Sequence, residues 1–201
     1  MRKTAVWAPG FLLLALAGGC AARPLTTGLA PYSPTLGPYV YYEEGAEILI
    51  TVGTLATRAR ADDNFFPLEI GMANKSQNRT LIVAHESFSV EVGDGEEIPA
   101  ATPAEVIAGY RALEADKGLF RSREFTAAYF DRYRRVESRL YPNSQRRSGV
   151  VRDVVELPSG TYFQDVLYFQ SPGYSLRGNR VRLLIRLRAN EDPLVVAFKV
   201  E

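Results

Sequence analysis

The run Arg180 to Arg188 is the feature that most constrains the fold of this chain. Arginines at 180, 182, 186 and 188 alternate there with Val181, Leu183, Ile185 and Leu187. A period of two places one set of side chains in a core and the other in water, as in a half-buried β-strand. The run therefore predicts a strand on the surface of a β-rich domain.

Seven further runs have β-like composition and similar length, and turn residues such as Gly93-Asp94-Gly95 and Pro158-Ser159-Gly160 lie between some of them. These runs cover residues 47–55, 66–72, 81–84, 87–92, 150–157, 162–169 and 194–200. Short strands with frequent turns are typical of a two-sheet sandwich or a barrel. We therefore predict a mainly β fold of about seven strands.

Some of these runs carry a more specific pattern. It consists of Phe66-Pro67-Leu68-Glu69-Ile70 before Asn74-Lys75-Ser76, Leu157-Pro158-Ser159-Gly160 before Asp165-Val166-Leu167-Tyr168-Phe169 and Pro172, and Val195, Ala197 and Phe198. The pattern resembles the immunoglobulin-like domains of uncharacterised bacterial envelope lipoproteins. This resemblance implies an immunoglobulin-like β-sandwich that serves as a scaffold and implies no activity, because the fold hosts many functions.

The middle of the chain has a different period. Thr102, Pro103 and Glu105 form a capping-box pattern that predicts a helix start, and Val106, Ile107, Tyr110 and Leu113 mark its apolar face. A second helix is predicted over 122–140 from the spacing of Phe125, Tyr129, Tyr133, Val136 and Leu140. We therefore expect an α-helical hairpin inserted into the sandwich at about 102–141.

The second predicted helix carries our candidate partner-binding residues, Tyr129, Tyr133, Arg132, Arg135 and Arg139. The stretch 118–152 holds nine arginines and three acidic residues, while the whole chain has a net charge of +1. A basic patch of this kind suits an anionic partner. The alternative interpretation is that the arginines pair locally with acids or remain in water.

The sequence offers little for catalysis or metal binding. His85 is the only histidine, and its neighbours Glu86 and Ser87 would point to alternate faces of a strand, so they cannot form a relay with it. No metal-ligand spacing and no phosphate-binding glycine motif occur, and we expect no cofactor. The near-neutral charge disfavours nucleic acid as a partner. A carboxylate-based hydrolase remains a remote third hypothesis.

The N-terminal segment 1–19 has the order of a secretory signal. Arg2 and Lys3 precede a short apolar run that is too short to span a bilayer, and small residues close it. The residues Leu16-Ala17-Gly18-Gly19-Cys20 resemble a lipobox. The resemblance implies that Cys20, the only cysteine, is acylated and anchors the protein in a membrane.

A proline-rich stretch follows this cysteine. We assign residues 20–38 to a lipidated tether, because four prolines, glycines and hydroxyl residues favour extended chain, and residues 39–201 to the folded domain. Ala21 stands after the lipobox cysteine instead of aspartate. By the same resemblance, this implies the bacterial outer membrane, with the domain facing the periplasm.

The sequence thus predicts a lipid-anchored, non-catalytic envelope protein. The first hypothesis is an interaction or assembly module that docks on another envelope protein through the helical insertion. The alternative is binding of anionic lipid or a small amphiphile at the membrane surface.

Replacement of the lipobox cysteine tests the anchor. In the variant Cys20→Ala no thiol is left to acylate, so we expect the protein to move from the detergent phase to the aqueous phase in Triton X-114 partition of whole cells. The wild-type chain is the control. A variant that remains in the detergent phase would contradict lipidation at this residue.

Overall fold

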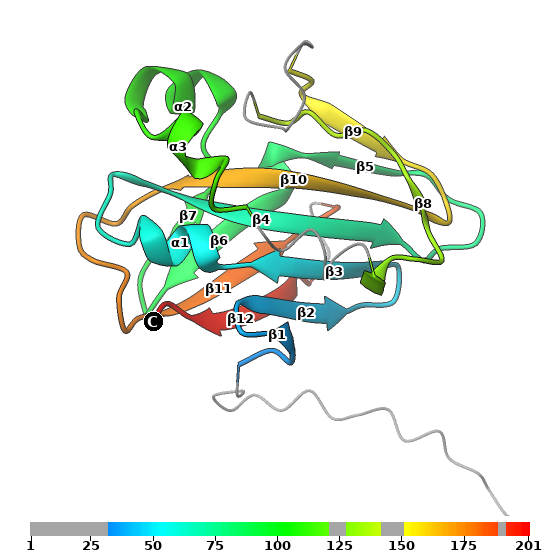
Figure 1. The fold of residues 1–201 in the computed structure, drawn as a ribbon. Coiled ribbons are helices and arrows are strands. Elements are labelled where there is room, and N and C mark those ends of the chain that lie inside the picture. Colours follow the sequence, from blue (N-terminus) through cyan, green and yellow to red (C-terminus); the bar gives the residue numbers. More distant parts are fainter. Residues whose placement is uncertain (1–31, 121–127, 142–150, 189–191) are drawn as a thin grey trace, which may run out of the picture. The chain divides into compact units, whose positions relative to one another are not determined.

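The computed structural model describes residues 32–120, 128–141, 151–188 and 192–201 (Figure 1). The predicted signal segment 1–19, Cys20 and most of the predicted tether lie outside these ranges. The described chain is mainly β, as the sequence predicts.

The largest sheet has six strands and curls into a half-barrel. We call it sheet A. Its order from edge to edge is β1 (Thr35–Gly37), β2 (Val40–Glu44), β3 (Ile48–Gly53), β4 (Phe65–Asn74), β10 (Thr161–Gln170) and β8 (Arg134–Arg135). All neighbours are antiparallel except β8, which pairs with β10 in parallel.

Two smaller sheets complete the β structure. Sheet C has the order β12 (Leu194–Lys199), β11 (Arg180–Ile185), β6 (Phe88–Val92) and β7 (Glu97–Pro99), and much of it passes behind sheet A in Figure 1. A two-stranded ribbon pairs β5 (Leu81–Ala84) with β9 (Val154–Leu157). The Gly93 and Gly160 turns lie where predicted, and both glycines have positive φ, which a residue with a side chain rarely adopts.

The main core lies between sheets A and C. Phe66, Leu68 and Ile70 of β4 are buried together with Val90 of β6 and Leu183 of β11. The alternation seen in the sequence therefore places its apolar residues as predicted. Arg182 of β11 pairs with Glu91 of β6, and Arg186, directly after β11, pairs with Glu97 of β7.

Two short backbone links join the sheets at their sides. Ser33 donates its N–H to the Ala197 carbonyl at 2.8 Å, and the Ala197 N–H donates to Ser33 Oγ at 2.9 Å. On the other side, Ala100 bridges to Phe169. The seven-stranded immunoglobulin-like sandwich is therefore not confirmed, since the chain forms a curled six-stranded sheet closed against a four-stranded one.

Short helical segments between the strands of the described chain include α1 (Leu55–Ala59), the 3-10 helix η1 (His85–Ser87), α2 (Pro103–Gly109) and α3 (Leu113–Asp116). The α2 start is confirmed, because Thr102 and Glu105 form the predicted capping box. Val106 and Tyr110 are buried as predicted. Ile107 is 61% exposed, so its assignment to the apolar face was wrong.

The second predicted helix, 122–140, is wrong over its C-terminal part. Residues 122–127 lie outside the described ranges, and the helical assignment ends at Tyr129. Beyond a turn, the chain is extended and forms β8, with the Arg134 N–H donating to the Gly160 carbonyl at 3.0 Å and the Val136 N–H to the Tyr162 carbonyl at 2.8 Å. Pairing with the edge of β10 thus outweighs the helical spacing of the side chains.

Four elements carry no clear sequence signal: β1, β2, α1 and β7. Thr35–Gly37 belongs to the stretch that we assigned to the tether, yet it forms β1 on the edge of sheet A. The folded part therefore begins before residue 39, where we had placed its start. A three-residue strand is too short to show a period.

Asn74 ties the ribbon to the end of β4. Its side-chain amide donates to the carbonyls of Arg79 and Leu157 at 2.6 and 2.8 Å, and its Oδ1 accepts from the Ser76 N–H at 2.9 Å. The residue is fully buried. It is therefore a structural asparagine, although Asn74-Lys75-Ser76 matches a glycosylation pattern.

The variant Asn74→Ala should lower the free energy of unfolding by about 2–3 kcal/mol, because it leaves buried polar groups without partners. Asn78→Ala is the control, since Asn78 is exposed and should change stability by less than about 0.5 kcal/mol. Chemical denaturation measures both. Equal midpoints for the two variants would contradict the structural role of Asn74.

Candidate interaction surface

The candidate surface is built on a turn that is anchored by one aromatic ring. Phe130 is fully buried on the face of sheet A that points away from sheet C. It stacks on Tyr162 of β10 with ring centroids 5.0 Å apart, and Leu49 of β3 and Ala73 of β4 belong to the same cluster. The Tyr133 N–H donates to the Phe130 carbonyl at 2.9 Å and closes the turn.

Two of the predicted residues flank this anchor. Tyr129 lies 5.7 Å from the Phe130 ring and 5.2 Å from Tyr42 of β2, and Tyr133 lies 6.2 Å from Phe130, all as centroid distances. Both tyrosines are half-buried, and burial raises the pKa of Tyr129. The two rings therefore support the turn with one side and keep the other side accessible.

Three exposed arginines follow along the same stretch. The Arg132 guanidinium lies 5.3 Å from the centre of the Tyr133 ring, a cation–π distance. Arg134 and Arg135 form β8 at the edge of sheet A. We call Tyr129, Arg132, Tyr133, Arg134 and Arg135 the Tyr–Arg strip.

The structure brings together four of the five predicted residues. Arg139 is not part of the strip, because the extended chain carries it beyond β8, where its guanidinium contacts Glu137 at 3.4 Å. Arg134 was missed, since on a helix it would lie outside the predicted arginine stripe. In a strand it is the immediate neighbour of Arg135 at the sheet edge.

Most other arginines of the described chain have acidic partners. Examples are Arg60 with Asp116, Arg79 and Arg188 with Glu47, Arg177 with Asp62, Arg182 with Glu91 and Arg186 with Glu97. By contrast, the three arginines of the strip form no salt bridge with any described residue. Local pairing, the first half of our alternative interpretation, therefore does not apply to the strip. Its second half, arginines that remain in water, fits the exposure of these three residues.

The chain that follows the strip docks on β10 through a buried carboxylate. We call residues 136–141 the strap. Asp165 Oδ2 accepts from the Leu140 N–H at 2.8 Å and from the Ser138 hydroxyl, and Asp165 Oδ1 accepts from the Val166 N–H at 2.8 Å. Asp165 is buried, and this burial raises its pKa to about 6 against the three hydrogen bonds, which lower it.

Asp116, another buried acid, has a structural role. Both oxygens of Asp116 are occupied, one by Arg60 Nε at 2.7 Å and the other by the Tyr110 hydroxyl at 2.7 Å. Burial, and after it this hydrogen bond, raises the pKa of Tyr110. The cluster joins α3 to the chain that follows α1.

His85 lies in η1, where its Nε2 is 3.3 Å from Oε1 of the neighbouring Glu86. The Ser87 hydroxyl accepts from the Ala84 N–H, so it caps the turn. Within the described ranges, no three histidine, cysteine, aspartate or glutamate side chains cluster in a way that could hold a metal ion.

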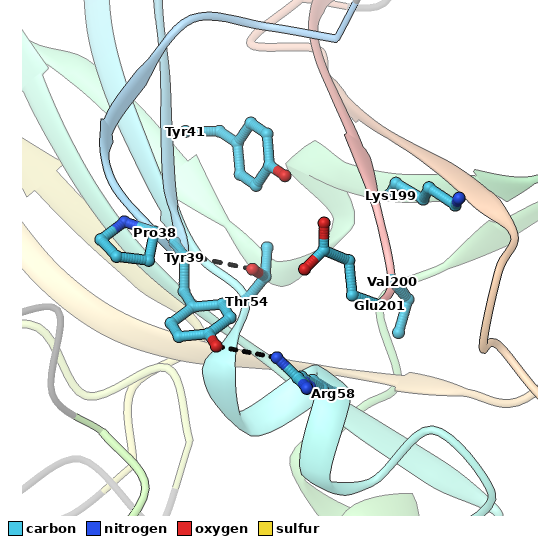
Figure 2. Close-up of a pocket in the computed structure, with 8 residues that line it drawn as sticks. All are labelled: Pro38, Tyr39, Tyr41, Thr54, Arg58, Lys199, Val200 and Glu201. Carbon is cyan, nitrogen blue, oxygen red and sulfur yellow. Dashed lines mark hydrogen bonds between the residues drawn. The ribbon is translucent and has the colours of Figure 1, made fainter.

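A small hollow lies between β2, α1 and the end of β12 (Figure 2). It is lined by Pro38, Tyr39, Tyr41, Thr54, Arg58, Lys199, Val200 and Glu201. The Arg58 guanidinium donates to the Tyr39 hydroxyl at 2.7 Å, and the Thr54 hydroxyl donates to the Tyr39 carbonyl at 3.2 Å. These bonds attach the N-terminal end of β2 to α1, so we assign the residues of the hollow a structural role.

None of the helices in the described ranges has the length and apolar character needed to cross a membrane.

Comparisons with known proteins give little further information. No protein-family model matches this chain, and no curated protein matches it. One solved structure is similar, that of a Bacillus subtilis protein named "putative lipoprotein (ycdA)", with 8% sequence identity and a TM-score of 0.40. The match covers 79% of this chain and 38% of that one. A likeness at this level assigns neither fold nor function.

Removal of the anchoring ring tests how the strip is held. Phe130→Ala should lower the free energy of unfolding by about 3–5 kcal/mol, because it empties a buried aromatic site on sheet A. Asp131→Ala changes an exposed neighbour in the same turn and should cost less than about 0.5 kcal/mol. If thermal unfolding of the two variants is the same, the turn is not anchored through Phe130.

Proposed function

We propose that this chain is a non-catalytic, lipid-anchored protein of the bacterial cell envelope that binds an acidic face of a partner protein through the Tyr–Arg strip. The observation that carries the proposal is the set of three exposed arginines in a four-residue stretch, held in place by Phe130, that form no salt bridge with the residues that the structure describes. The anchor is Cys20, and we place the domain at the outer membrane, facing the periplasm, on the strength of the lipobox resemblance.

The residue types of the strip favour a protein as partner. Tyrosine and arginine are enriched at protein interfaces, and they dominate interface energies when they are held rigidly. The turn and the parallel pairing of β8 fix the backbone of the strip, so little conformational entropy is lost on binding. Exposed, unpaired guanidinium groups suit carboxylates because they can form bidentate pairs.

The alternative partner, anionic lipid, fits the strip less well. Recognition of acidic lipid surfaces usually involves clusters of about four to eight basic residues. The strip holds three arginines, and exposed Asp131 lies within the same stretch. We therefore treat lipid binding as an outcome that the experiment has to separate from protein binding.

The experiment compares two charge-matched double variants of the full-length protein. Arg134→Gln with Arg135→Gln removes two charges from the strip, and Arg111→Gln with Arg152→Gln removes two exposed charges elsewhere. A photo-reactive residue in place of Arg132 reports the contact in living cells. We expect one protein adduct, reduced about tenfold or more in the strip variant and unchanged in the control.

Two results would contradict the proposal. Equal loss of the adduct in both double variants would mean that total charge, not the strip, determines binding. A lipid adduct without any protein adduct would replace the proposed partner by the membrane surface.

A further inference from the structure

Asp165 stands at the point where the strap meets the sheet. It lies on β10 opposite Ile70 of β4, on the side of the strand that faces the main core. Its carboxylate is buried, yet it accepts two hydrogen bonds from the strap, from Ser138 and from the Leu140 N–H. The carboxylate thus binds the strap by hydrogen bonds, while the loss of water around it destabilises its ionised form.

The strap is held by few other contacts of this kind. The Val136 N–H donates to the Tyr162 carbonyl at 2.8 Å, the Arg152 N–H donates to the Arg139 carbonyl at 2.8 Å, and the Tyr141 hydroxyl donates to the Ala101 carbonyl at 2.6 Å. Leu140 and Tyr141 are buried at the C-terminal end of the strap. Arg134 and Arg135 directly precede it, so the position of the strap fixes the end of the Tyr–Arg strip.

We propose that Asp165 is a pH-sensitive latch that holds the strap on β10 more firmly in mildly acidic conditions than in neutral ones. The latch deepens the proposed function, because it would regulate how the Tyr–Arg strip is presented. The existence of the latch rests on the burial of Asp165, on its two hydrogen bonds to the strap and on its raised pKa, whereas its biological meaning rests on that function.

The direction follows from proton linkage. While the strap is docked, the pKa of Asp165 is about 6; when the strap opens and water reaches the carboxylate, the pKa should fall toward its ordinary value of 3.8. The docked state therefore binds the proton more tightly, so protonation favours docking. Docking weakens as pH rises from about 4 to 6 and changes little above that range.

No other charged group accounts for this behaviour within the described ranges. Burial raises the pKa of Asp165, three hydrogen bonds lower it, and no neighbouring charge contributes. The Tyr141 phenol faces Asp165 but stays neutral at these pH values, because burial raises its pKa. Among the charged side chains beside Asp165, Glu69 is opposite Val166 on the other face, Glu97 is bound to Arg186, and Glu137 and Arg139 of the strap contact each other at 3.4 Å. Arg134, Arg135 and Glu156 are exposed.

Hydrogen exchange at a single amide tests the latch in the intact protein. The Leu140 N–H cannot exchange while it is bonded to Asp165. After correction for intrinsic rates, its opening constant should rise about tenfold between pH 5 and pH 7, as the two pKa values require. The Ser171 N–H, which directly follows β10 and donates to the Asn64 carbonyl at 2.9 Å, is the control and should show no such change.

Carboxyl NMR titration provides the second measurement. The Asp165 resonance should titrate near pH 6 in the wild-type chain and at a higher pH in Ser138→Ala, because the Ser138 hydroxyl stabilises the ionised form. Asp165→Asn should abolish the pH dependence of Leu140 exchange; if this variant does not fold, the other two results decide.

An Asp165 midpoint near 4, or equal Leu140 opening constants at pH 5 and pH 7, would overturn the latch. Neither measurement involves a partner. A failed latch therefore leaves the proposed function standing, and a failed partner experiment leaves the latch standing.

Discussion

The burial of β4 and β10 on both faces is the constraint on which the rest of the structure depends. Every residue of β4 is buried, although sheet C covers only one of its faces. The other face must therefore be covered by connecting segments. At one end Tyr110 packs against Phe65 and Tyr168, and at the other end Phe130 packs against Tyr162. An all-β domain with such a sheet needs an insertion, and the middle third of this chain supplies it.

The insertion holds the Tyr–Arg strip rigidly because the same segment has to cover the face of sheet A that sheet C leaves open. A segment that buries Phe130 has to run across the ends of β2, β3 and β4 before it joins the free edge of β10. Arg132, Arg134 and Arg135 then project into solvent from a backbone that is fixed by core packing, with Arg134 and Arg135 on opposite faces of β8. Asp165 adds a polar attachment at the far end of this path. The surface that we propose as an interface is thus the outer side of a structural cover.

The sequence predicts the strands well because half-buried strands leave a period of two, as in 180–188. It predicts the start of α2 for a similarly local reason, the capping box at Thr102. It does not predict the path of residues 130–141, because Tyr129, Tyr133, Val136 and Leu140 have helical spacing. The interaction that competes with a helix is pairing with the open edge of β10, whose residues lie 25 or more positions further along the chain. The anchor Phe130 was missed because it lies off that helical stripe. Asp165 gave no signal, because its surroundings exist only after folding.

The path of this segment can be measured directly by NMR of the intact domain. The account predicts extended secondary chemical shifts over residues 134–136 and close contacts between the ring protons of Phe130 and Tyr162. Continuous helical shifts from residue 130 to residue 140, without contacts between these two rings, would contradict it. That result would restore the helical arginine stripe and remove the basis for the strip, for its anchor and for the latch.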